Sequence, residues 1–216
     1  MAGGLRSGHA GANSGSKELH SVMSVGAKSV SAAFFNLPNQ LTVSRLILSL
    51  VLFAFVGLKW YLTSLVLFII AASTDWLDGY LARKYGQVTQ LGRILDPFVD
   101  KVIVCGTFIF LVGIEGSGVH AWVAVIIVGR ELLVTALRSF LEQQGADFSA
   151  TMSGKLKMVF QCIAAGLSLF YLYLNASGSA PDWLYGGVVA AVSLAVLLTI
   201  TSGIAYVRAA IRLFTA

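Results

Sequence analysis

The sequence predicts an all-α integral membrane protein, a bundle of six transmembrane helices, and three observations support this fold class. Of the 216 residues, 57% are hydrophobic and only 12% are charged. The mean hydropathy is +0.82, whereas a soluble domain carries about 25% charged residues. Six apolar runs approach the roughly 20 residues that cross a bilayer, and basic residues fall on alternate connections between them. This composition excludes an ordinary soluble globule and a disordered chain.

The first 33 residues differ in composition from the rest of the chain. They contain six glycines and seven serines, and no apolar stretch is long enough for the core of a signal peptide. We expect region 1–33 to be a disordered tail. From Leu19 onward its apolar positions recur at helical spacing, as in an amphipathic helix on a lipid surface. The six-helix membrane domain is expected over 34–216.

The apolar runs that follow are predicted to be helices because they lack the alternation of membrane-barrel strands. Segments rich in turn residues separate them. Pro97 predicts that the third helix begins beside Asp96, which would cap it. The predicted spans are 41–58, 61–81, 95–114, 119–141, 156–174 and 184–207.

The basic residues predict the orientation of the bundle. With six spans both termini share one side, and that side holds eleven lysines and arginines, against only Lys59 in the three opposite connections. Basic residues accumulate on the cytoplasmic side, so we expect a multi-pass protein of the cytoplasmic (inner) membrane with cytoplasmic termini. Trp60, Trp122 and Trp183 fall at the opposite span ends, as interfacial anchors do. The net charge of +5 then requires no nucleic acid partner.

Four of the ten acidic residues fall within 26 positions, near the cytoplasmic ends of the second and third predicted spans. Asp75 and Asp78 are three residues apart and Asp96 and Asp100 four apart, so each pair lies on one helix face. A short connection makes the two helices antiparallel neighbours, and the acidic faces can meet. Because one aspartate at the centre of a span costs about 2.5–3.5 kcal/mol, four together form a candidate functional site.

Four carboxylates that face one another need compensating cations, since some would otherwise be protonated. Arg83, Arg93 and Lys101 could supply them in a purely structural, salt-bridged cluster. Two divalent ions would compensate the charge better, and carboxylate oxygens select hard cations such as Mg²⁺ or Mn²⁺. A pair of such ions about 3.5–4 Å apart is a known device for in-line displacement at phosphorus. The cluster therefore predicts a two-metal site.

Residues 75–100 follow the pattern D-x2-D-G-x2-A-R-x8-G-x3-D-x3-D. This pattern resembles the signature of the CDP-alcohol phosphatidyltransferases at every defined position. The segments 36–45 (NLPNQLTVSR), 129–138 (GRELLVTALR) and 154–157 (GKLK) look like the phosphatidylglycerophosphate synthase branch of that family. The resemblance covers about residues 36–210 and leaves out the tail.

The resemblance implies an enzyme that works by direct displacement at the cytoplasmic membrane face. An acceptor hydroxyl attacks the phosphorus of CDP-diacylglycerol nearest the diacylglycerol, and CMP leaves. Asp75, Asp78 and Asp96 are implied ligands of the two ions, and Asp100 is implied to be a further ligand and the catalytic proton acceptor. The resemblance also implies a homodimer. It implies seven contacts with CDP-diacylglycerol: Pro38, Asn39, Thr42, Gly79, Ala82, Arg83 and Thr89.

The remaining basic residues indicate the acceptor. Arg130 lies within the fourth span beside Glu131, and charges within a span are by default a functional hypothesis. Arg138, Lys155 and Lys157 lie toward the cytoplasmic end, where orientation alone also explains them. Arginine and lysine together suit an acceptor that carries its own phosphate, so these four cations are the candidate acceptor-phosphate site. Inositol phosphate fits the charge equally well, and the choice of glycerol 3-phosphate rests on the branch resemblance.

Two alternatives remain open. The same chemistry could use another acceptor, either inositol phosphate or phosphatidylglycerol as in cardiolipin synthesis. A divalent-cation transporter would also gather carboxylates between spans, but it predicts acidic residues along a pathway, whereas here they lie at one membrane face. The expected partners are CDP-diacylglycerol, glycerol 3-phosphate and membrane lipid.

Overall fold

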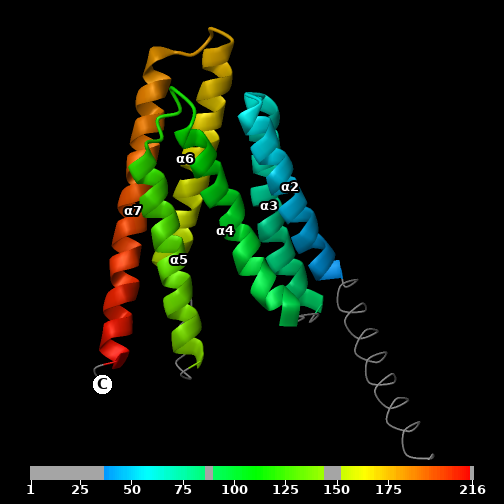
Figure 1. The fold of residues 1–216 in the computed structure, drawn as a ribbon, viewed down its shortest axis with the longest axis vertical. Coiled ribbons are helices and arrows are strands. Elements are labelled where there is room, and N and C mark those ends of the chain that lie inside the picture. The colour runs from blue at the N-terminus through cyan, green and yellow to red at the C-terminus, as the bar shows by residue number, and fades with distance from the viewer. Residues whose placement is uncertain (1–36, 86–89, 144–151, 215–216) are drawn as a thin grey trace, which may run out of the picture.

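The structure is a computed structural model that describes residues 37–85, 90–143 and 152–214 (Figure 1). Within these ranges the side chains of 75–85, 90–97, 100, 152–155 and a few other positions near helix ends are not described. The described residues form six α-helices and no strand, which confirms the all-helical prediction. The helices are α2 (Leu37–Gly57), α3 (Tyr61–Tyr85), α4 (Gln90–Val112), α5 (Ala121–Gln143), α6 (Met152–Ala176) and α7 (Asp182–Phe214). The expected tail, 1–33, lies outside the described residues.

Each predicted span corresponds to one helix, but several helices are longer than the apolar run that predicts them. α4 begins at Gln90, so the prediction that Asp96 caps this helix is wrong, and Pro97 lies inside the helix. α7 continues to Phe214, seven residues beyond the predicted end of its span. The apolar runs therefore predict where the helices lie but not where they end.

Apolar surface is exposed all around the bundle, as in a protein surrounded by lipid. Segments Leu156–Ala176 of α6 and Asp182–Arg212 of α7 are each long and apolar enough to cross a membrane. Shorter apolar segments, Thr42–Gly57, Tyr61–Thr74 and Lys101–Val112, lie in α2, α3 and α4. Every helix exposes large apolar side chains, for example Ile47, Leu62, Ile109, Val125, Ile163 and Leu197. The apolar helices therefore indicate a membrane protein.

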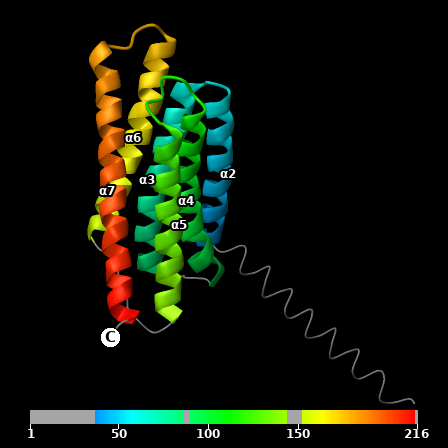
Figure 2. The ribbon, with the colours of Figure 1, turned by 60° about the vertical axis from the view of Figure 1, so that its left-hand side comes forward.

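The six helices run roughly along one axis, with α2 and α7 on opposite sides of the bundle (Figures 1 and 2). α2 packs on both α3 and α4, and α7 packs on both α5 and α6. Contacts of α3 and α4 with α6, and of α4 with α5, connect the two sides. Fully buried side chains fill the interior between them, including Leu52, Phe108, Leu111 and Leu169.

The connection between α4 and α5 is fixed by hydrogen bonds at the end of the bundle opposite the C-terminus. Ser117 Oγ donates to the carbonyl of Leu111 (2.7 Å), and Ser168 Oγ of α6 donates to the carbonyl of Ser117 (2.6 Å). Gly118 has a positive φ of 71°, and a Cβ there would lie 2.8 Å from Val188 Cγ1 of α7. Glycine is therefore required at position 118 both for the turn and for the approach of α7.

Candidate active site

The two acidic pairs lie on neighbouring helices at one end of the bundle. Asp75 and Asp78 are in the last three turns of α3, and Asp96 and Asp100 are in the first half of α4. α3 and α4 pack against each other, and the end of α3 lies at the same end of the bundle as the start of α4 (Figure 1). Their side chains lie outside the described part of the chain, so their roles as ligands and base stay predictions.

The residues predicted to contact CDP-diacylglycerol belong to the same end. The start of α2 lies there too, and α2 packs on both α3 and α4 (Figure 1). Thr42, in the second turn of α2, is buried. Thr89 lies outside the described residues. The other members of the set lie in α2 and α3 at positions whose side chains are not described: Pro38, Asn39, Gly79, Ala82 and Arg83.

The aspartates of α3 and α4 are the donor set that fits a metal centre. Among the side chains that the structure describes, no group of three or more His, Cys, Asp or Glu residues is arranged to hold a metal ion. Four carboxylates carried by two adjacent helix ends supply the oxygen donors that Mg²⁺ and Mn²⁺ prefer. The chemistry of this donor set fits a pair of hard divalent ions.

A buried cluster of charged side chains joins α5 to α6. Arg130, Glu131 and Lys157 are all less than one-tenth exposed. Arg130 Nη1 donates to Glu131 Oε1 at 3.2 Å, and Lys157 Nζ pairs with the same carboxylate oxygen. One carboxylate oxygen therefore serves two basic side chains, so the cluster has one more basic group than it has acidic groups. A buried charge without a counterion is costly, and a bound anion would remove that cost.

A hydrogen-bonded chain connects this cluster to the helix that carries Asp96 and Asp100. Lys101 Nζ of α4 donates to Thr135 Oγ1 of α5, and Thr135 Oγ1 donates to the carbonyl of Glu131 (2.6 Å). Lys101 directly follows Asp100 in the sequence. These hydrogen bonds therefore connect α4, next to Asp100, with α5, at Glu131.

The guanidinium of Arg130 presents one edge without a partner. Among the described residues, Arg130 Nε and Nη2 have no hydrogen-bond partner although both are buried, and the same holds for Arg138 Nε. Nε and Nη2 are the two donors of one side of the guanidinium, the arrangement that binds a carboxylate or phosphate bidentately. Burying a donor without an acceptor costs about 1–3 kcal/mol, and more for a charged group. This edge therefore indicates a place for an anion.

The four predicted acceptor-phosphate residues are partly brought together. Arg130 and Lys157 meet at Glu131. Arg138 lies two turns further along α5 on the same side and is partly exposed. Lys155 is in the first turn of α6, and its side chain is not described.

Two contacts to this cluster were not predicted from the sequence. Lys101 was expected only as a countercharge for the aspartates, and its bond to Thr135 joins positions 34 residues apart. The ring of Tyr206 from α7 lies 5.5 Å from Arg130 Cζ. A tyrosine in an apolar helix carries no sequence signal for such a role. For Lys101 the sequence does carry a signal, because a charged residue inside a predicted span is expected to have a polar partner on another helix.

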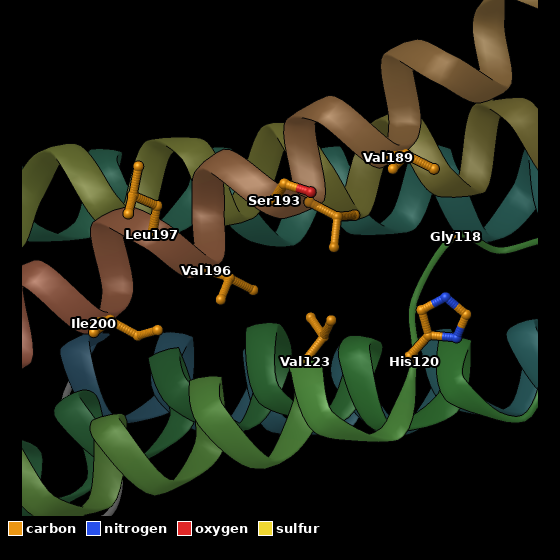
Figure 3. Close-up of a pocket in the computed structure, with 9 residues that line it drawn as sticks. Gly118, His120, Val123, Val189, Ser193, Val196, Leu197 and Ile200 are labelled. Atoms are coloured by element: carbon orange, nitrogen blue, oxygen red, sulfur yellow. The ribbon is translucent and has the colours of Figure 1, made fainter.

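A separate cavity of about 370 Å³ lies between the start of α5 and the middle of α7 (Figure 3). Its wall is apolar apart from His120 and Ser193, and it contains none of the predicted site residues. This cavity is therefore not part of the candidate active site, which the acidic and basic clusters define.

Comparison with known proteins identifies the family of this chain. The CDP-alcohol phosphatidyltransferase family profile matches residues 35–207. Three similar proteins are named CDP-diacylglycerol–glycerol-3-phosphate 3-phosphatidyltransferase. The protein of Bacillus subtilis is 38% identical over 153 residues, which cover 63% of this chain and 78% of the relative. Those of Haemophilus influenzae and Rickettsia bellii are 35% and 34% identical, and the matches cover 82% and 83% of this chain and 94% and 97% of the relatives.

Proposed function

Because this chain belongs to the CDP-alcohol phosphatidyltransferase family, we propose that it transfers the phosphatidyl group of CDP-diacylglycerol to glycerol 3-phosphate. The products are phosphatidylglycerol phosphate and CMP. The names of the relatives support this reaction. The observation in the structure that carries the proposal is the unpartnered Nε–Nη2 edge of Arg130, buried beside Lys157 and linked to the helix of Asp100.

A phosphate-bearing acceptor fits this cluster on charge. A phosphomonoester dianion would neutralise the excess positive charge and accept both hydrogen bonds from the Arg130 edge. Serine and choline carry no net negative charge and would leave the positive charge of the cluster uncompensated. Inositol phosphate would satisfy them as well, and the named relatives favour glycerol 3-phosphate over it. Arg138 and Lys155 complete the proposed phosphate site from the same end of α5 and α6.

We assign the chemistry to the acidic end of α3 and α4. Asp75, Asp78, Asp96 and Asp100 would hold two Mg²⁺ or Mn²⁺ ions, which neutralise the diphosphate and the charge that develops on the departing CMP. Asp100 also takes the proton of the attacking hydroxyl. The nucleotide is held by seven residues from α2, α3 and the following connection: Pro38, Asn39, Thr42, Gly79, Ala82, Arg83 and Thr89.

The Lys101–Thr135 link supports a common orientation of base and acceptor. It ties α4, which carries Asp100, to α5, which carries Arg130. An acceptor whose phosphate is anchored on Arg130 would then present its hydroxyl toward α4 in a fixed position. Fixing two reactants in this way lowers the entropic part of the barrier.

The proposed setting is the cytoplasmic membrane, with all six helices spanning it and the active site on the cytoplasmic side. The excess of lysine and arginine on one side of the bundle supports this orientation. The exposed Trp60, Trp122 and Trp183 lie at the opposite end, at or beside the starts of α3, α5 and α7, as interfacial anchors do. The acidic and basic clusters then lie at the cytoplasmic end, where the water-soluble acceptor reaches them. A homodimer in the membrane is also proposed, on the family resemblance alone.

A CMP-release assay tests the proposed reaction. Purified protein in detergent with CDP-diacylglycerol, glycerol 3-phosphate and Mg²⁺ should release CMP and form phosphatidylglycerol phosphate, detected by chromatography and mass spectrometry. Asp100→Asn should abolish release while CDP-diacylglycerol still binds, because an amide cannot take the hydroxyl proton, whereas Asp75, Asp78 and Asp96 still supply carboxylate ligands for the ions. Asp182→Asn, an exposed aspartate in the first turn of α7, is the matched control. Release with inositol phosphate or phosphatidylglycerol, and none with glycerol 3-phosphate, would show that the acceptor is wrong.

A further inference from the structure

The guanidinium of Arg130 is held from two sides by different helices. On the α5 side, Glu131 accepts from Nη1 at 3.2 Å and is itself held by Lys157. On the α7 side, the ring of Tyr206 lies 5.5 Å from Arg130 Cζ, within the range of a cation–π contact. Tyr206 is 6% exposed, so the contact is away from water, where it is strongest.

The aliphatic part of Arg130 also depends on α7. A Cβ placed at Gly203 would lie 3.1 Å from Arg130 Cγ, so the arginine stem passes closely over the bare backbone at this position. Gly203 and Tyr206 are three residues apart and share one face of the helix. The same face of α7 therefore leaves room for the stem and places a ring against the charged end.

We propose that Tyr206 is a positioning residue that sets the affinity of the enzyme for the phosphate of its acceptor, and that it does so through Arg130. The inference rests on the proposed function and deepens it. Glu131 and the ring together fix the guanidinium and leave Nε and Nη2 without a partner, the edge that we assign to the phosphate. Without the ring, Arg130 would gain rotational freedom and bind a phosphomonoester less tightly, whereas the aspartate end would be unaffected.

Steady-state kinetics of two Tyr206 variants test this role. Tyr206→Leu removes the ring and should raise the KM for glycerol 3-phosphate about 3- to 30-fold, the range that corresponds to a buried cation–π contact. The kcat and the KM for CDP-diacylglycerol should change less than about twofold, well below the tenfold that 1.4 kcal/mol represents. Tyr206→Phe keeps the ring face and should restore most of the affinity. Inhibition by inorganic phosphate, competitive with the acceptor, should weaken in parallel.

Tyr185→Leu is the matched control, because Tyr185 also lies in α7 and also contacts an aromatic ring, that of Tyr171 at 5.4 Å. It is 21 residues away, roughly 30 Å along the helix, and should leave all constants unchanged. If Tyr206→Leu does not fold, Gly203→Ala provides the second test, since its methyl group displaces the Arg130 stem and should raise the same KM.

Each remaining outcome overturns the inference. An unchanged acceptor KM in Tyr206→Leu would show that the ring does not position Arg130. Equal losses in the Phe and Leu variants would assign the effect to the hydroxyl group and not to the ring face. Equal changes in both KM values would indicate a general structural effect. If the unmodified protein releases no CMP with glycerol 3-phosphate, the proposed function fails, and this failure is separate from that of Tyr206.

Discussion

Replacing Gly106 by alanine tests how closely α2 and α4 are packed. A Cβ at this position would lie 2.7 Å from both Cε atoms of Phe53 and closer still to its Cζ. The ring of Phe53 is buried and is directed edge-on at the backbone of α4. It also stacks on Phe110, one turn further along α4, with ring centroids 5.2 Å apart and planes inclined by 13°.

Two opposing effects decide whether Gly106→Ala raises or lowers the free energy of unfolding. Alanine is favoured over glycine in a helix by about 1 kcal/mol. Over-packing a core costs about 1–3 kcal/mol, and the ring of Phe53 cannot withdraw without leaving its stack on Phe110, a pair worth about 0.5–1.5 kcal/mol. The clash is with the far edge of a confined ring, so we expect the unfavourable terms to win. Gly106→Ala should lower the free energy of unfolding by about 1–3 kcal/mol.

Reversible unfolding in mixed SDS–detergent micelles, followed by far-UV circular dichroism, measures this change. Gly166→Ala is the matched control, because a Cβ there would meet Leu65 Cδ1 at an ordinary 3.8 Å. It should leave stability unchanged or raise it by up to about 1 kcal/mol. In a Phe53→Leu background, which shortens the opposing side chain, Gly106→Ala should cost much less than in the unmodified protein.

Either of two results would refute this reasoning. The first is a Gly106→Ala protein as stable as the unmodified one, which would mean that the ring has room to move. The second is a loss of the same size with and without Phe53→Leu, which would place the strain elsewhere.

Three further predictions concern the site. Glu131→Gln should lower the free energy of unfolding by about 3–5 kcal/mol and raise the acceptor KM, because Arg130 and Lys157 lose their shared countercharge. SDS titration and kinetics measure the two changes, and Glu115→Gln in the exposed connection is the control. Unchanged stability would show that the three side chains do not form a stabilising cluster. Thr135→Val should cost about 1–3 kcal/mol and lower kcat, since it cuts the link to Lys101, and an unchanged kcat would show that the link does not orient the reactants. Chelation by EDTA should abolish CMP release and added Mg²⁺ or Mn²⁺ restore it, whereas activity that survives full chelation would refute the two-metal proposal.

The helices could be predicted from the sequence because each carries an apolar run, although among the described residues only the runs of α6 and α7 are long enough to cross a bilayer. Their ends could not, since α4 begins at Gln90 among polar residues that carry no hydrophobic signal. The turn between α4 and α5 was predicted from its glycines, and Gly116 and Gly118 indeed have positive φ angles.

The candidate site could be predicted in part, because charged residues within an apolar span are costly and are usually retained for a function. Arg130, Glu131 and Lys157 stand out for this reason, and the structure brings them together. That Glu131 serves both cations depends on how α5 and α6 approach each other, which no local pattern records. Tyr206 is 76 positions beyond Arg130, and only the packing of α7 on α5 brings its ring to the guanidinium.

The sharing of one carboxylate oxygen by Arg130 and Lys157 has a consequence for the resting protein. Without a bound anion, two buried basic side chains share one acidic partner, so binding of an anion there is expected to add to the stability of the native state. An anion that binds to Arg130 and Lys157 in the native state should raise the melting temperature by mass action. The enzyme should therefore be most heat-resistant when it is saturated with its phosphorylated acceptor, and the supply of that acceptor would then influence how long the folded protein lasts.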